Sequence, residues 1–212
     1  MSPRQAALAL ILALPSLALA APDPALVRTE QMIAAFKKVK PGVPAQANAA
    51  AFTELDSLID YDTITSRTVE PRAAKFTAAQ KAEFQKKFRE LIRLIAYPDS
   101  GDFFRKAKLT FRSVKNEGPQ TQVPFLAKLP EEDLETEVTL HWSKGAEGSL
   151  RIVDVSFDGD SLVRDYQNQI SKIVDRDGVG GLFKKLDERR AELDRNPAAV
   201  RAPAGAKGSR SP

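Results

Sequence analysis

The sequence contains no cysteine, and this absence excludes several ways of stabilising a chain and of doing chemistry. Disulfide bonds and thiolate nucleophiles are both ruled out, so the fold must be held together by its core alone. His141 is the only histidine, and zinc sites in proteins rely mainly on cysteine and histidine ligands. The pattern of residues also supports no Ser-His-Asp set, so neither a metal enzyme nor a triad hydrolase is indicated.

The chain between its two end segments also has little net charge. The formal net charge is +4 and the calculated isoelectric point is 9.3. Five cations near the ends account for this excess, and the stretch from residue 195 to 212 contains no acid. They are Arg4, Arg195, Arg201, Lys207 and Arg210. The chain between them is therefore close to neutral, which removes the main electrostatic support for binding nucleic acid.

The first twenty residues have the features of a secretory signal. Arg4 supplies a positive charge, Ala6–Leu14 is apolar, and Ala18–Ala20 has the small-x-small pattern of a cleavage site. The apolar run is too short to span a bilayer. We therefore expect a signal peptide over residues 1–20, one α+β domain over 21–194, and a disordered basic tail over 195–212.

Helical periodicity dominates the first half of the chain. Asp23 and Pro24 are typical of the N-cap and first residue of a helix, and Pro41 marks its end. Further helices are expected over 46–59, over 62–69, from Ser161 onward and over 179–193. Glycines at positions 178, 180 and 181 mark the break between the last two helices. They follow a helix and lack the Lys-Ser/Thr ending of a phosphate-binding loop, so we interpret them as a helix cap and hinge.

The clearest helix is predicted over residues 78–96. Thr77 and Gln80 have the spacing of a capping box. Its apolar residues form one continuous stripe: Phe84, Phe88, Leu91, Ile92 and Ile95. Pro98 is expected to stop this helix.

After Gly101 the apolar spacing changes from helical to alternating. The alternation predicts four antiparallel strands, each with one apolar face. They are expected around Leu109–Phe111, Val123–Phe125, Val138–Trp142 and Leu150–Phe157, with turns at 116–119 and 143–148 and a bulge or two-sided burial at 152–153. Helices before and after one sheet predict an α+β layer domain, in which helices cover one sheet face.

The last strand and the helix after it carry a recognisable pattern. Its residues are Ile152, Asp154, Val155, Gly159, Ser161, Leu162, Val163, Tyr166, Gln169 and Ile170. The pattern resembles the end of the periplasmic phospholipid-carrier family known as MlaC, or toluene-tolerance auxiliary proteins. The resemblance implies a nuclear-transport-factor-like cone with a four-stranded curved sheet wrapped by helices. It also implies a bound phospholipid with no other cofactor.

The resemblance further implies the partners of a carrier. They are an outer-membrane lipoprotein–porin complex and an inner-membrane transporter of the ATP-binding-cassette type, and the carrier itself is expected to be a periplasmic monomer. A lipid cavity between sheet and helices is expected to be lined by Phe84, Phe88, Leu91, Ile92, Ile95, Leu109, Phe111, Val123, Phe125, Val138, Leu140, Trp142, Ile152, Val155, Phe157, Leu162, Tyr166 and Ile170. Arg164 is the one candidate for a headgroup contact.

Periodicity does not distinguish a lipid cavity from an ordinary core, so two alternatives stay open. The first is an enzyme of the isomerase or dehydratase type on the same cone fold, with Asp154 as the nominated carboxylate. The second is a periplasmic adaptor with a solid core, which binds proteins rather than lipids.

We predict that the mature protein begins at Ala21 and is found in the periplasm. N-terminal sequencing of the exported protein checks this. An intact Met1 on the soluble protein would contradict it.

Overall fold

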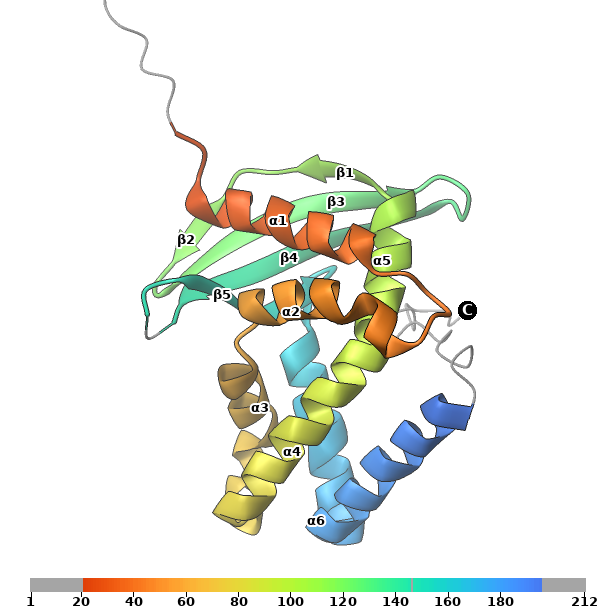
Figure 1. Cartoon of the computed structure of the whole chain (residues 1–212). Coiled ribbons are helices and arrows are strands. Elements are labelled where there is room, and N and C mark those ends of the chain that lie inside the picture. The colour runs from red at the N-terminus through yellow and green to blue at the C-terminus, as the bar shows by residue number, and fades with distance from the viewer. Residues whose placement is uncertain (1–20, 146, 196–212) are drawn as a thin grey trace, which may run out of the picture.

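The computed structural model describes residues 21–145 and 147–195. The predicted signal peptide and the tail beyond Arg195 lie outside these residues. Figure 1 shows a twisted antiparallel sheet crossed on one face by helices, and a second group of helices that extends away from the sheet. The predicted α+β class is confirmed, while the cone description stays a prediction.

The sheet has six strands rather than the predicted four. They are β1 (Lys108–Phe111), β2 (Lys115–Glu117), β3 (Gln120–Leu129), β4 (Leu134–Lys144), β5 (Leu150–Phe157) and β6 (Asp160–Ser161). Their order is β1-β3-β4-β5-β6, and β2 pairs with β3 alongside β1. The expected strands correspond to β1, β3, β4 and β5. The two additional strands are short pairings beside turns, made possible by positive φ angles at Gly118 and Gly159.

A β-bulge lies where two consecutive residues of β5 were expected to be buried. The register between β4 and β5 shifts, so that Trp142 pairs with Ile152 and His141 pairs with Asp154. Val153 is the extra residue, and both Ile152 and Val153 are buried. The prediction of a bulge is therefore confirmed.

The helices begin close to the positions that their caps predict. They are α1 (Pro24–Lys38), η1 (Ala45–Asn48), α2 (Ala49–Leu58), α3 (Tyr61–Val69), η2 (Glu70–Lys75), α4 (Ala78–Leu91), η3 (Ile92–Ala96), α5 (Tyr97–Lys106) and α6 (Leu162–Arg195). The Asp23 carboxylate accepts a hydrogen bond from the Ala25 amide at 2.8 Å, and the capping box of Thr77 and Gln80 is present. None of the described helices is long and apolar enough to cross a membrane.

Pro98 does not end the long helix, and this prediction was wrong. The η3 segment is a π-helical turn, in which the Tyr97 amide donates to the Ile92 carbonyl, and α5 then continues to Lys106. The wider turn places Pro98 in the first turn of α5, where its missing N–H is tolerated. The change to alternating spacing therefore falls at Ala107 and not after Gly101.

Gly178 divides α6 into two arms. Its φ of 72° and ψ of 178° are not helical, and an L side chain is strained at such a φ. The predicted helix break is therefore confirmed, and Figure 1 shows the second arm folding back along the first.

The buried apolar residues form two separate clusters. The sheet cluster lies between one sheet face and the helices α1, α2 and α5, with Trp142, Phe125 and Leu140 at its centre. Trp142 Nε1 donates to Thr29 Oγ1 at 3.0 Å, so its one polar atom is satisfied. The helix cluster lies between η2, α3, α4 and both arms of α6, and its members are Val69, Phe76, Phe84, Phe88, Ile170, Val174, Val179 and Leu182. We call the two parts of the molecule the sheet lobe and the helix lobe.

We predict that Gly101→Ala destabilises the sheet lobe. A Cβ at Gly101 would lie 2.8 Å from the Phe36 carbonyl oxygen and 3.2 Å from that of Val39, so α1 and α5 would have to move apart. We expect the free energy of unfolding to fall by about 1–3 kcal/mol. Chemical denaturation followed by circular dichroism measures this.

Gly180→Ala is the matched control, because a Cβ there meets nothing within 4 Å. It should leave stability unchanged or raise it by about 0.5–1 kcal/mol. Equal losses in the two variants would refute the close approach of α1 and α5.

Candidate functional site

The two apolar clusters meet at the π-helical turn. Ile92 is half-buried and packs against both the sheet cluster and the helix cluster. Its neighbours Leu91, Leu94 and Ile95 are also half-buried but belong to neither cluster, and the main contacts of the turn are with α4 and α5. We call Leu91, Ile92, Leu94 and Ile95 the apolar seam. It is a place where apolar side chains stay partly uncovered between two cores.

The structure divides the predicted lipid-lining residues between the two clusters. In the sheet cluster or packed against it are Leu109, Phe111, Val123, Phe125, Val138, Leu140, Trp142, Ile152, Val155 and Phe157. In the helix cluster or packed against it are Phe84, Phe88, Tyr166 and Ile170. Ile92 contacts both, whereas Leu91, Ile95 and Leu162 are half-buried outside both.

Phe88 and Val138, both expected to line one cavity, do not face each other in this structure. The sheet face that carries Val138 is covered by α1, α2 and α5, while Phe88 packs against Tyr166 of α6, with ring centroids 5.2 Å apart. The π-turn explains the difference, because its wider turn rotates the apolar stripe of the long helix. The residues before the turn then face the helix lobe, and those after it face the sheet lobe.

A buried carboxylate lies beside the apolar seam. Asp56 on α2 has only 5% of its side chain exposed. It accepts hydrogen bonds from Tyr97 Oη at 2.7 Å, from Arg89 Nη2 at 2.8 Å and from Arg93 Nη2. Tyr61 Oη lies 3.3 Å from Asp56 Oδ1 and 2.6 Å from Tyr97 Oη. We call these five residues the Asp56 cluster.

The electrostatics of the Asp56 cluster favour an ionised aspartate. Burial alone would raise the pKa of Asp56, but the hydrogen bonds from Arg93, Arg89 and Tyr97 outweigh it and lower this pKa below its ordinary value. Burial, together with the neighbouring hydroxyl and Asp56, raises the pKa of Tyr97 strongly, and burial raises that of Tyr61 as well. The cluster therefore contains one carboxylate, two guanidinium groups and two neutral phenols.

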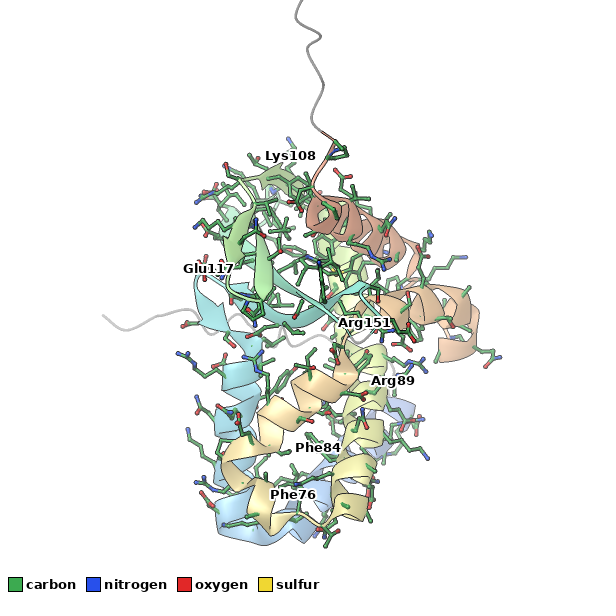
Figure 2. All side chains as sticks on the ribbon, turned by 90° about the vertical axis from the view of Figure 1, so that its left-hand side faces the viewer. Phe76, Phe84, Arg89, Lys108, Glu117 and Arg151 are labelled. Carbon is green, nitrogen blue, oxygen red and sulfur yellow. The ribbon has the colours of Figure 1, made fainter. Side chains whose placement is uncertain are left out.

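The Asp56 cluster connects the two lobes. Asp56 and Tyr97 come from helices that cover the sheet, whereas Tyr61 and Arg89 come from α3 and α4 of the helix lobe. Arg93 belongs to the π-turn between them, and its buried Nε has no hydrogen-bond partner among the described residues. Figure 2 shows Arg89 at the level between the sheet and the part of the helix lobe marked by Phe84.

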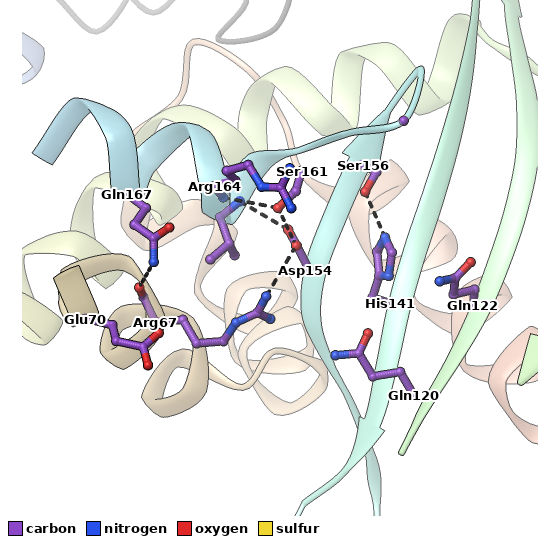
Figure 3. A pocket seen from close by; sticks show the side chains of 12 residues that line it. Arg67, Glu70, Gln120, Gln122, His141, Asp154, Ser156, Ser161, Arg164 and Gln167 are labelled. Carbon is purple, nitrogen blue, oxygen red and sulfur yellow. Dashed lines mark hydrogen bonds and ion pairs between the residues drawn. The ribbon is translucent and has the colours of Figure 1, made fainter. Parts of the chain in front are cut away.

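A polar hollow of about 390 Å³ lies on the opposite face of the sheet. Figure 3 shows it between β3, β4 and β5 on one side and the ends of α3 and α6 on the other. Its lining consists of Arg67, Glu70, Gln120, Gln122, His141, Asp154, Ser156, Gly159, Ser161, Val163, Arg164 and Gln167. Val163 is the one apolar side chain in this lining, and Gly159 has no side chain to contribute. This hollow therefore does not suit acyl chains.

Asp154, the nominated catalytic carboxylate, has a structural role in this hollow. It accepts hydrogen bonds from Ser161 Oγ at 2.5 Å, from the Val163 amide at 3.1 Å and from the Val155 amide at 2.8 Å. It thereby caps the first turn of α6. His141 Nε2 lies 2.8 Å from Ser156 Oγ, and burial lowers the pKa of His141. Among the described residues, no group of three His, Asp or Glu side chains is placed to hold a metal ion.

The Asp56 cluster was not predicted from the sequence. One signal was available, because Asp56 lies four residues after Phe52 and therefore on the buried face of α2. Arg89 and Arg93 also lie four residues apart, on one face of the long helix.

We predict that Asp56→Asn lowers the free energy of unfolding by about 2–4 kcal/mol at pH 7, because it leaves two guanidinium groups without their carboxylate. Since the folded-state pKa is lowered, this stabilisation is present above the ordinary pKa of 3.8 and is lost as pH falls through the folded-state pKa. The difference from wild type should be constant from about pH 7 to 5 and shrink below about pH 4. Denaturation curves at several pH values test this, and an unchanged difference at low pH would contradict it.

Comparisons with known proteins identify the family. The model of the family described as "MlaC protein" matches residues 28–188, which is most of the chain. A solved structure with the same fold is a phospholipid-binding protein from Ralstonia solanacearum in complex with a phospholipid, with a TM-score of 0.65, 19% identity, and coverage of 81% of this chain and 97% of that one. A search of curated proteins found no match. The extent of the family match shows that this chain belongs to the MlaC family.

Proposed function

We propose that this protein is a periplasmic phospholipid carrier and not an enzyme. The observation that carries the proposal is the apolar seam, where two apolar clusters meet through Ile92 in a chain of the MlaC family. The similar fold of a protein solved with a bound phospholipid adds support. By family, the carrier exchanges lipid as a monomer between an outer-membrane lipoprotein–porin complex and an inner-membrane transporter of the ATP-binding-cassette type.

The cost of exposing acyl chains to water determines what kind of binding site is needed. Two acyl chains hold roughly 30 methylene groups, and exposing each to water costs about 0.8 kcal/mol, so carriage must offset on the order of 25 kcal/mol. A surface patch covers too little of the chains. Bound lipid therefore needs a pocket with apolar walls on both sides of each chain.

The two clusters supply such walls once they separate. In this structure the side chains of each cluster pack against one another within their own lobe, and the half-buried Ile92 packs against both clusters. We propose that acyl chains enter at the apolar seam, with the sheet cluster on one side and the helix cluster on the other. Of the 18 apolar residues expected from the sequence to line the pocket, Leu91, Ile92 and Ile95 belong to the seam and would meet the chains first. Residues at the centre of the sheet cluster, such as Trp142 and Phe125, stay covered by α1, α2 and α5.

The headgroup stays in water in this proposal. Arg164 lines the polar hollow rather than the apolar seam, and the chain between its basic ends is nearly neutral. Chain partition, rather than recognition of one headgroup, therefore supplies the affinity.

A protein-binding adaptor with a solid core is the second candidate, because both clusters are closed in this structure. An enzyme is not favoured, since Asp154 serves as a helix cap. Lipid analysis separates the carrier from the adaptor.

We predict that the purified mature protein carries phospholipid whose headgroup composition mirrors that of the host membrane. Mass spectrometry of extracted lipids measures this. Lipid-free protein would favour the adaptor, whereas capture of one anionic class alone would refute chain-dominated binding.

We predict that Ile92→Asp abolishes lipid binding while the protein remains folded, because Ile92 is half-buried and a carboxylate there keeps contact with water. Leu134→Asp is the control, since Leu134 is 43% exposed and lies outside both clusters. It should retain lipid. Retention of lipid by a folded Ile92→Asp protein would place the pocket elsewhere.

A further inference from the structure

The Asp56 cluster holds the long helix at one angle to its neighbours. Asp56 receives donors from α4, from the π-turn and from α5, so one carboxylate contacts three successive parts of the same helical rod. Tyr61 connects this rod to the start of α3. A change of angle between α4 and α5 must therefore break several of these hydrogen bonds together.

The cluster can open at a moderate cost. The side chains of Arg89 and Arg93 are 46% and 36% exposed, so water can hydrate both guanidinium groups when they leave Asp56. The same movement would let water hydrogen-bond to the buried Nε of Arg93, which has no partner among the described residues. The Tyr97 ring can stay in place, because it packs edge-on against Phe36 and Phe52.

The π-turn lies where the long helix passes from one lobe to the other. A π-turn is a locally wider helix that is common at functional positions, and here it carries most of the apolar seam. A bend there would move α4 and the helix lobe away from the sheet lobe. The Asp56 cluster lies across this bend on the side of α2 and α3.

We propose that the Asp56 cluster is a polar latch that holds the two lobes closed and sets the rate at which lipid enters and leaves. This inference rests on the proposed function. The latch stabilises the closed form and not the open one, so weakening it shifts the population toward the open form. Loss of one hydrogen bond of the latch should raise the lipid transfer rate about fivefold.

Tyr97→Phe is the main test variant, because it removes the hydroxyl that donates to Asp56 and pairs with Tyr61 Oη, and it keeps the ring. Asp56→Asn is the stronger variant. Asp102→Asn on α5 is the matched control, because Asp102 is 41% exposed and forms surface ion pairs with Lys106 and Arg105. The measurement is transfer of a fluorescent phosphatidylcholine from donor to acceptor vesicles by the full mature protein.

We expect faster transfer by Tyr97→Phe and Asp56→Asn, and transfer at the wild-type rate by Asp102→Asn. Unchanged or slower transfer by a folded Tyr97→Phe protein would overturn the latch and leave the carrier function intact. Absence of transfer by wild type would overturn the proposed function instead.

Amide hydrogen exchange of the lipid-free proteins tests the latch independently of lipid. Residues 91–97 should exchange faster in Tyr97→Phe than in wild type or Asp102→Asn. Equal exchange rates would overturn the latch whatever the lipid assay shows, and this readout does not depend on the folding of Asp56→Asn.

Discussion

One helical rod that passes from one apolar core into another is the constraint on which this structure depends. Its first part, α4, packs Phe84 and Phe88 into the helix cluster, and its last part, α5, packs Tyr97 and Phe104 into the sheet cluster. A straight α-helix would present one continuous face. The π-turn changes that face within a single turn, so the rod belongs to both cores and the seam between them stays partly uncovered.

The process proposed for the site is partition of acyl chains and not catalysis. The polar groups described above hold helices in place and take no part in binding the chains. Asp154, Ser161, Arg67 and Gln167 connect the sheet edge to α3 and α6, where they cap and fasten the helix lobe. Asp56 and its partners join α2, α3 and the long helix in a separate set of contacts. The helix lobe is thus fastened by polar contacts at two places, and the apolar surfaces need no polar group to hold a lipid.

Sequence patterns predicted the features of the fold that depend on interactions between residues close together in the chain or on one strand pair. The caps at Asp23 and Thr77, the break at Gly178 and the bulge after Ile152 each depend on residues within one turn or one strand pair. The π-turn was missed because a proline usually ends a helix, and only the packing of α5 against α1 shows that the helix continues. Periodicity also grouped the stripe from Phe84 to Ile95 with the sheet, since spacing shows which residues are buried and not what they are buried against. The Asp56 cluster joins residues up to 41 positions apart, and no local pattern reports such a contact.

The central claim is that acyl chains bind between the two clusters, which must therefore move apart. The chain has no cysteine, so two introduced cysteines can be spin-labelled selectively, one at the exposed Thr53 on α2 and one at the exposed Lys184 on α6. Pulsed electron paramagnetic resonance then measures the distance between the lobes with and without bound phospholipid. A longer distance in the lipid-loaded protein is the predicted result. An identical distance in lipid-free and fully loaded protein would contradict the account.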